Sequence, residues 1–491
     1  MTRTHDLRLR RQSLYPAELW VLKHSLREVY YNILRRWYNS AKMRNILLTF
    51  VLFLLTGVLL TVFAYLGWLT PFFLSATFCI ILLLFVYCIA ILFSKLHLLS
   101  KLELVLIYLF VCIWSMHFLQ VLVPETGFDA LWYHLPVAQG VLHAKGLVYL
   151  PQLYQSVNPQ FADLYFLAGF SVFGIFGAKL IAYIFASFLA VATYYLSRLF
   201  VPRQFAILIA LIISTFQVIA WQSASFYIDV AKAFFEIEGL LFIFLDKDFY
   251  KKVGLLFFAA SLATKLFSLL LVPVFIFSFG IQKFFSRKFG VYFLLLFGVP
   301  LLYYWFAYTH IGNPFYSLIV HTEKLQEIGG QANPFLFTLL KLSTLPRSLY
   351  FFMTARDYVN PILILLLIPI FMKIRTVWQD KKLRTLLIFS LAQWCVWWFI
   401  PPLSTRYAIS GFITMFILGT AIITHEYTKN QKNKNQFMLV LLFFTLLAVV
   451  PRTIVARRSL QYILTNQTRQ NYLQQFYDGS IDEKINSWYG Y

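Results

Sequence analysis

Charge is scarce in this chain. Of its 491 residues only 13% are charged and 20 are acidic, whereas 60% are hydrophobic and 19% are aromatic. The mean hydropathy of +0.71 lies far above that of soluble globular domains. The shortage of charge excludes a soluble protein and predicts an all-α integral membrane protein that crosses the bilayer many times.

Cysteine is also rare, with four residues in the chain. The four cysteines all fall inside apolar runs, with no CxxC pair and no histidine at ligand spacing. We therefore expect neither a disulfide framework nor a cysteine metal site. About 45 polar and basic residues precede the first apolar run, so we expect no cleaved leader. The chain also lacks a convincing internal repeat, which counts against a transporter built from duplicated halves.

Long apolar runs are abundant. A helix needs roughly 20 apolar residues to cross a bilayer, and by that measure the sequence predicts about 13 spans. They lie near residues 46–69, 71–94, 102–123, 176–198, 204–221, 230–246, 253–265, 266–282, 289–309, 361–375, 384–400, 407–425 and 436–451.

The basic residues fix an expected orientation. The net charge is +22, and most of the 42 Lys and Arg residues lie at the N-terminus and in alternate loops. By the positive-inside rule this predicts a multi-pass membrane protein with a cytoplasmic N-terminus, and not a nucleic-acid binder. Residues 1–45 have amphipathic helical spacing, which suits either a helix on the membrane surface or one packed on the protein's own cytoplasmic side.

The spans predict four regions along the chain. Two spans in 46–101, to which we assign no function, follow the N-terminal segment 1–45. A main body at 102–451 contains two long non-cytoplasmic loops, 124–175 and 310–360, and an external tail runs from 452 to 491. Within the first loop, "FADLYFLAGFSVFG" is too short to cross comfortably and predicts a helix lying along the outer surface.

Ionisable residues at the outer end of the bundle are few. They are Asp129, His134, Asp229, Lys265 and Arg406, from four distant parts of the sequence. Each costs free energy in a membrane, about 2.5–3.5 kcal/mol at a helix centre, and so requires a reason. Carboxylates beside cations suit glycosyl transfer from a lipid phosphate, since a carboxylate can engage the acceptor hydroxyl and cations can hold the departing phosphate.

Simpler interpretations stand beside this one. Asp129 and Asp229 are each placed to cap a helix, while His134 and Tyr133 suit anchors in the headgroup layer. The two cations suit side chains that extend to the interface. Asn313, in "HIGNPFYS", by itself marks a turn.

The motif order adds a resemblance that covers residues 102–425. It is carried by "FDALWYHLPVAQ", "NPQFADLYFLAGFSVFGIFGAKL", "YIDVAKAFF", "LATKLFSLLLVP", "GNPFYS" and "STRYAIS". In these stretches the sequence resembles the GT-C superfamily of polyprenyl-phosphate-sugar-dependent glycosyltransferases, particularly bacterial family 39-like members related to protein O-mannosyltransferases and the aminoarabinose transferase. The two spans before residue 102 look like an addition to the usual GT-C-like core. Only this resemblance implies that the membrane is the plasma (inner) membrane.

The resemblance implies roles for particular residues. Asp129 becomes the catalytic base. Ala130 stands where many members have a second acid, which counts against a two-carboxylate site or a metal ligand at that place and leaves His134 or Asp229 as substitutes. The resemblance makes no cofactor certain, and a divalent metal stays possible. Lys265 and Arg406 look like contacts to the donor phosphate.

Three further residues within these motifs complete the expected site. Tyr407 follows Arg406 and would help to bind the donor phosphate, and Tyr133 and Asn313, like Asp229, would contact substrate.

The sequence thus predicts an inverting single displacement that moves a sugar from a polyprenyl-phosphate donor to a lipid, glycan or protein acceptor on the non-cytoplasmic side. Three alternatives remain open. They are a transporter or flippase of a lipid-linked sugar, an accessory subunit without chemistry, and an oligosaccharide ligase that uses a diphosphate carrier.

Overall fold

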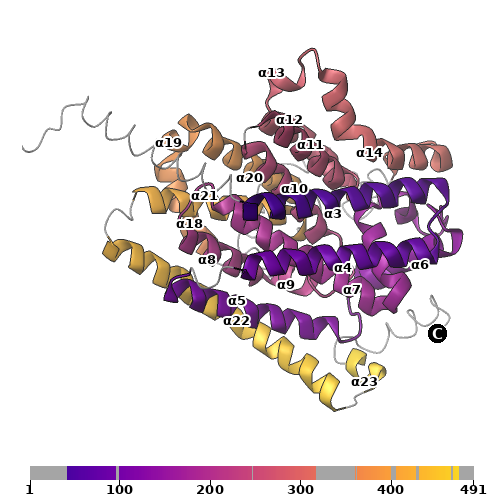
Figure 1. The fold of residues 1–491 in the computed structure, drawn as a ribbon, viewed down its shortest axis with the longest axis horizontal. Coiled ribbons are helices and arrows are strands. Elements are labelled where there is room, and N and C mark those ends of the chain that lie inside the picture. Colours follow the sequence, from indigo (N-terminus) through magenta and orange to yellow (C-terminus); the bar gives the residue numbers. More distant parts are fainter. Residues whose placement is uncertain are drawn as a thin grey trace, which may run out of the picture.

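The chain is all-helical throughout the residues that the computed structural model describes, which are 41–94, 99–245, 247–316, 360, 362–399, 405–426, 431–465 and 468–474. Figure 1 shows the helices gathered in one bundle. Most of the predicted amphipathic segment 1–45, of loop 310–360 and the end of tail 452–491 lie outside the described residues.

The helices follow the predicted apolar runs. The longer ones are α3 (Ala41–Leu66), α4 (Pro71–Phe93), α5 (Lys101–Val121), α7 (Phe161–Ser197), α10 (Asp229–Phe244), α11 (Asp248–Leu262), α14 (Phe289–Ile311), α20 (Lys381–Phe399), α21 (Ile409–Glu426) and α22 (Gln431–Leu464). The shorter ones are η2 (Ala130–His134), α6 (Leu135–Ala144), η3 (Tyr154–Val157), α8 (Arg203–Ser214), α9 (Gln217–Gln222), η4 (Leu266–Leu271), α12 (Val272–Phe279), α13 (Ile281–Phe284), α18 (Ile362–Met372), α19 (Ile374–Gln379), η5 (Thr405–Ala408) and α23 (Arg469–Gln474).

Seven helices among the described residues are long and apolar enough to cross a membrane. A membrane-embedded helical protein is therefore confirmed. The count of about 13 spans is not, because the remaining predicted spans coincide with shorter or more polar helices.

Several predicted boundaries were wrong. The run 204–221 is divided at Thr215 and Phe216 into α8 and α9, and the run 266–282 opens as the 3-10 helix η4. The predicted boundary between the last span and the tail at residue 452 does not coincide with a helix end, because α22 continues through Pro451 to Leu464. Proline is tolerated in membrane helices where neighbouring groups satisfy the freed carbonyl. At 34 residues α22 is about 51 Å long, which exceeds the roughly 30 Å of bilayer hydrocarbon.

A short helix separate from the predicted span 176–198 is present as the first part of α7, most of its residues are buried, and its place along the outer surface stays a prediction. Helical geometry breaks at Phe173 and at Gly174, whose φ of 57° falls in the left-handed region that favours glycine. The two parts then pack backbone to backbone: a Cβ on Gly177 would lie 2.0 Å from the carbonyl oxygen of Gly169. Glycine at both positions therefore permits the reversal that returns the chain from the loop to the bundle.

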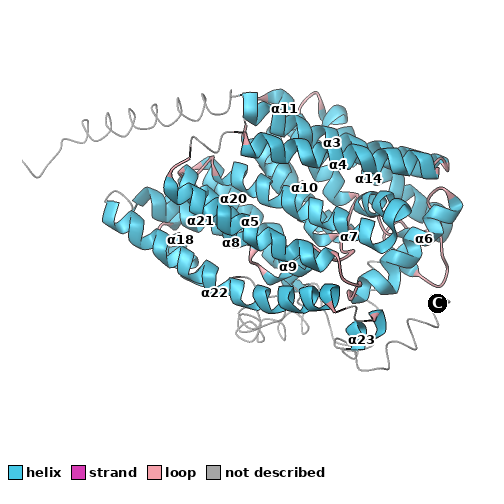
Figure 2. Cartoon of the chain, turned by 60° about the horizontal axis from the view of Figure 1, so that its bottom comes forward, coloured by secondary structure: helices cyan, strands magenta, loops and turns pink. Residues whose placement is uncertain are grey.

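The two helices in 46–101 pack into the same hydrophobic core as the rest. The hydroxyl of Tyr165 in α7 donates to the carbonyl oxygen of Phe53 in α3 at 2.5 Å, and the hydroxyls of Thr61 and Tyr303 hydrogen-bond at 2.8 Å. On another face α5 and α22 lie side by side, as Figures 1 and 2 show.

Helix α10 lies at the centre of the bundle. It packs against α7, α11 and α21, and every one of its residues is buried. It nevertheless carries four ionisable side chains, Asp229, Lys232, Glu236 and Glu238. Buried charges are costly and usually paired or hydrogen-bonded, as Asp229, Lys232 and Glu236 are here, so we expect a functional site at the start of α10.

Candidate functional site

Four breaks between helices bring the predicted charged residues to one place. Asp129 precedes the π-helix η2, Asp229 is the first residue of α10, and Lys265 lies in the extended link between α11 and η4. Arg406 belongs to η5, the 3-10 turn that leads into α21. Because each residue stands at a helix end, its side chain can reach the others without breaking helical hydrogen bonds.

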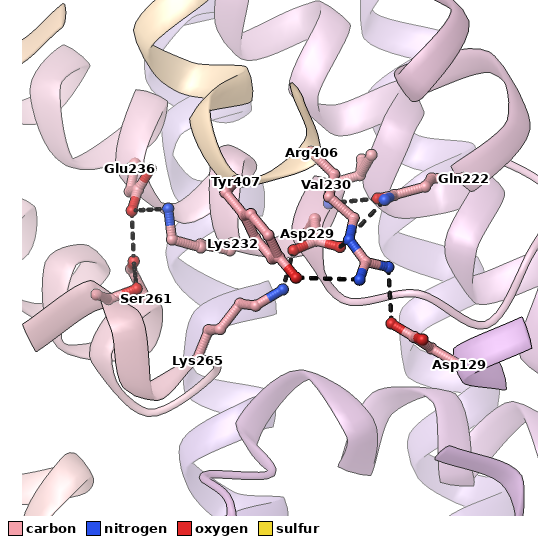
Figure 3. Close-up of polar contacts among 11 residues, drawn as sticks. Asp129, Gln222, Asp229, Val230, Lys232, Glu236, Ser261, Lys265, Arg406 and Tyr407 are labelled. Carbon is pink, nitrogen blue, oxygen red and sulfur yellow. Dashed lines mark hydrogen bonds and ion pairs between the residues drawn. The ribbon is translucent and has the colours of Figure 1, made fainter. Parts of the chain in front are cut away.

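Arg406 is the centre of this cluster. Its Nη1 atom lies 2.7 Å from Oδ2 of Asp129, and its Nε atom lies 3.9 Å from Oδ2 of Asp229. Its Nη2 atom donates to the hydroxyl of Tyr407 at 3.1 Å. Figure 3 shows the guanidinium between the two carboxylates. A planar fork of this kind suits carboxylate and phosphate oxygens alike.

Lys265 completes the charge balance. Its ammonium pairs with Oδ1 of Asp229 and lies 4.5 Å from the ring centroid of Tyr407. The side chain of Asp229 is only 1% exposed, whereas those of Lys265, Arg406 and Asp129 are 14–15% exposed. In this cluster Asp229 is buried, and the other three charged side chains are each partly exposed.

Asp229 is further held by Gln222 in α9. The amide nitrogen of Gln222 donates to Oδ2 of Asp229 at 3.1 Å, and its oxygen accepts from the backbone N–H of Val230 at 3.2 Å. Asp229 therefore has partners on both carboxylate oxygens, and its role exceeds that of a simple helix cap.

Asp129 is not a capping residue. Within the described residues its side chain makes no capping hydrogen bond to η2, so the simpler interpretation is wrong and the carboxylate instead meets Arg406. The backbone N–H of Asp129 donates to the hydroxyl of Tyr227 at 2.9 Å, and the ring of Tyr227 lies 5.4 Å from the Arg406 guanidinium carbon. Tyr227 thus touches both members of the pair.

Glu125 joins the loop that carries Asp129 to the loop before α10. Its Oε1 atom accepts from the backbone of Gly127 at 2.8 Å and from Ser225 Oγ at 2.6 Å, and its Oε2 atom accepts from the backbone of Phe226 at 2.9 Å. A Cβ on Gly127 would lie 2.5 Å from both Ser225 and Tyr227. Only glycine fits there without displacing a neighbour.

Tyr133 lies close enough to the cluster for its charged groups to influence the pKa of the phenol. Burial, and next the charge of Asp129, raise the pKa of its phenol well above the usual range. Burial likewise raises the pKa of Tyr227. A phenol is protonated at neutral pH even without these shifts and can donate a hydrogen bond to an anion, and the substrate contact of Tyr133 stays a prediction.

His134 has a different environment from the one expected. Its Nδ1 atom lies 2.6 Å from Oδ1 of Asp163 at the start of α7, and its ring stacks on Phe226. Its side chain is 3% exposed. A headgroup anchor is therefore excluded, and the geometry makes His134 a link between η2 and α7, one residue away from Tyr133.

Asn313 is placed in a turn after α14. Its side-chain oxygen accepts from the backbone N–H of Phe315 at 2.9 Å, the local contact that a turn asparagine makes. Within the described residues no hydrogen bond joins Asn313 to the Arg406 cluster, so its predicted substrate contact stays a prediction.

Sequence reasoning missed Tyr227, Gln222 and Glu125. Tyr227 stands two positions before Asp229, and Glu125 four before Asp129, but this proximity along the chain does not distinguish either residue from its neighbours. As for metals, the described part of the chain contains no group of three His, Cys, Asp or Glu side chains able to hold an ion. The two carboxylates best placed for one, Asp129 and Asp229, face Arg406 instead.

Comparisons with protein-family models, curated proteins and solved structures give no match to this chain. The resemblance to GT-C glycosyltransferases therefore stays a prediction from the motifs, and the argument for function depends on the geometry of the site.

Proposed function

We propose that this protein is an integral-membrane glycosyltransferase that moves a sugar from a polyprenyl phosphate to an acceptor hydroxyl on a lipid, glycan or protein. One observation carries the proposal: Arg406 links Asp129 and Asp229, beside Lys265, in a cluster drawn from four separate segments. A base and two cations at one partly exposed place are what the transfer requires. The proposal includes a cytoplasmic N-terminus and a site on the non-cytoplasmic side.

The proposed reaction is a single displacement. The acceptor oxygen attacks the anomeric carbon, the bond from that carbon to the phosphate oxygen breaks, and the configuration inverts. Asp129 takes the acceptor proton, and Lys265 and Arg406 hold the phosphate as its charge grows. Because the cations face charge that develops only as the bond breaks, they stabilise the transition state more than the bound donor.

We also propose an order of events, which the observed pairing of Asp129 with Arg406 supports. Arg406 holds Asp129 at 2.7 Å, so the carboxylate is occupied before substrate arrives. An incoming phosphate competes for the guanidinium and releases Asp129 toward the acceptor. The buried pair of Asp229 and Lys265 keeps its own charge balance during this exchange.

The test is sugar transfer by the purified protein in proteoliposomes, with a panel of radiolabelled polyprenyl-phosphate sugars and crude membrane acceptors. Wild type should release polyprenyl phosphate together with a glycosylated product, and Asp129→Asn should not. Asp248→Asn is the matched control, because Asp248 is an exposed carboxylate paired with Lys252 and Lys283. Equal turnover by Asp129→Asn and wild type would remove Asp129 as the base.

A transporter of a lipid-linked sugar is the second candidate, favoured by one feature. Besides the Arg406 cluster, α10 carries a buried ion pair further along the helix, between Lys232 and Glu236 at 2.7 Å. Polar groups deep in a membrane bundle are a feature of substrate pathways. Movement of a labelled donor across the vesicle membrane without release of polyprenyl phosphate would favour this candidate.

A further inference from the structure

A second polar cluster lies next to the Arg406 cluster, further along α10 from Asp229, and Glu236 is at its centre. The carboxylate is fully buried, and its Oε1 atom meets Lys232 Nζ at 2.7 Å and Ser261 Oγ at 2.9 Å. Its Oε2 atom accepts from Gln393 Nε2 at 2.7 Å and from Ser410 Oγ. These four donors come from α10, α11, α20 and α21, so one carboxylate joins four helices.

The donors to Glu236 are close in sequence to the residues of the site. Three of them stand within one helical turn of a charged site residue: Lys232 three positions after Asp229, Ser261 four before Lys265, and Ser410 four after Arg406. Figure 3 shows Lys232, Glu236 and Ser261 beside the pair of Lys265 and Asp229. Ser261 Oγ also lies 3.1 Å from Ser268 Oγ in η4, within hydrogen-bond distance, so the link that carries Lys265 is held at both of its ends.

Stability alone does not account for this arrangement. A buried ion pair is often no better for stability than well-packed apolar side chains of the same volume, because both charges lose their hydration. What a fully bonded carboxylate supplies is fixed geometry, since each donor must stay within hydrogen-bond reach of one of two oxygens. Here the fixed distances are those between the ends of α10, α11 and α21, where Asp229, Lys265 and Arg406 stand.

We infer that Glu236 is a positioning residue that holds Lys265 and Arg406 at the spacing required for a phosphate group. This inference rests on the proposed function in one respect, the identity of the anion as the phosphate of a polyprenyl donor. Its geometric part, that Glu236 fixes the place of Lys265, does not depend on that identity.

Two variants test the inference on the purified full-length protein. Glu236→Gln preserves volume but leaves Lys232 without a counter-charge, whereas the double variant Glu236→Gln with Lys232→Met removes both charges together. The probe is a short-chain polyprenyl monophosphate, whose Kd is measured by calorimetry. We expect both variants to bind it about 10- to 100-fold more weakly than wild type, the usual effect of losing a group that orients a binding residue.

Glu238→Gln is the matched control. Glu238 lies two positions along the same helix and is also fully buried, but neither of its oxygens has a hydrogen-bond partner among the described residues. Its variant should bind the probe as wild type does. Weakening by Glu238→Gln equal to that by the Glu236 variants would assign the effect to α10 packing and overturn the inference.

A second readout does not use the donor. Labelling of Lys265 by a small amine reagent, followed by mass spectrometry, should be faster in both Glu236 variants, because the ammonium is held less firmly against Asp229. If wild type fails to bind the probe, the proposed function fails, and the labelling rate alone decides the inference. Unchanged labelling and unchanged probe binding in folded Glu236 variants would overturn it. If both Glu236 variants fail to fold, Ser261→Ala and Ser410→Ala each remove one hydrogen bond to Glu236, and probe binding and Lys265 labelling in these variants decide the inference.

Discussion

The hydroxyl of Tyr227 accepts a hydrogen bond from the backbone N–H of Asp129 at 2.9 Å, across 98 positions of sequence. This bond fixes the backbone of the proposed base and not its carboxylate. The segment just before α10 therefore sets where Asp129 stands relative to Arg406 and Asp229.

Tyr227→Phe tests that relationship. The variant leaves a partly buried N–H without its acceptor, which costs about 1–3 kcal/mol. Because the loss falls on the backbone of Asp129, we expect kcat/KM for sugar transfer to decrease by about tenfold, equivalent to about 1.4 kcal/mol. Tyr183→Phe is the control, since it removes a similar hydroxyl bond, to the carbonyl oxygen of Trp114, far from the cluster in sequence. Equal loss in both variants would contradict the prediction.

Arg406→Lys tests whether the site requires the several separate nitrogen donors of the guanidinium in addition to its positive charge. A single ammonium cannot reach Asp129, Asp229 and Tyr407 together, as Arg406 does. We expect kcat/KM to decrease by about 100-fold or more while the protein stays folded. Arg384→Lys, at a half-buried arginine that donates to the carbonyl oxygen of Trp378, should leave kcat/KM unchanged.

Glu125→Gln should uncouple the two loops of the site. A glutamine amide has one acceptor oxygen in place of two, so the N–H of Gly127 or of Phe226 loses its partner. We expect a fall in the free energy of unfolding of about 1–3 kcal/mol for each unsatisfied donor. Thermal unfolding in detergent measures this. Asp248→Ala, which removes an exposed carboxylate, should change the unfolding temperature little.

Gly177→Ala should be among the most damaging small substitutions in the chain. The new methyl group would lie 2.0 Å from the carbonyl oxygen of Gly169, so the two parts of α7 must separate. We expect a loss of several kcal/mol, on the order of 3 kcal/mol or more, as for other overpacked or strained core sites. Gly290→Ala in α14 meets nothing within 4 Å and should be neutral in the same thermal unfolding measurement.

The charged core of the site could be predicted because charge is conspicuous in an apolar chain. Asp129, Asp229, Lys265 and Arg406 each stood out as costly residues at helix ends, and the structure places them in contact. Tyr227, Gln222 and Glu125 could not be selected in the same way. Tyrosine is abundant here, and the value of Glu125 depends on loop contacts across about 100 positions that no local pattern encodes.

The same contrast applies to the helices. The break in α7 follows a glycine and was predicted, whereas the division between α8 and α9 falls at Thr215 and Phe216, which carry no turn signal. The predicted span 436–451 ended at Pro451, whereas α22 continues through this proline to Leu464. Proline limits a helix in water more strictly than in a bundle whose other groups satisfy the backbone, so this boundary could not be read from the residue type.

The composition of α10 has a consequence for biosynthesis. Its 16 residues include one aspartate, two glutamates and one lysine, and none of its surface faces outward. Each such charge near the middle of a helix opposes insertion by about 2.5–3.5 kcal/mol, so α10 alone is a poor substrate for the insertion machinery. As the predicted span 230–246, it would enter the bilayer together with the helices that supply its partners, α11 first among them. Assembly of the bundle's centre is thus a late event, and the charged cluster forms only when the last partner segment, that of Arg406, has left the ribosome.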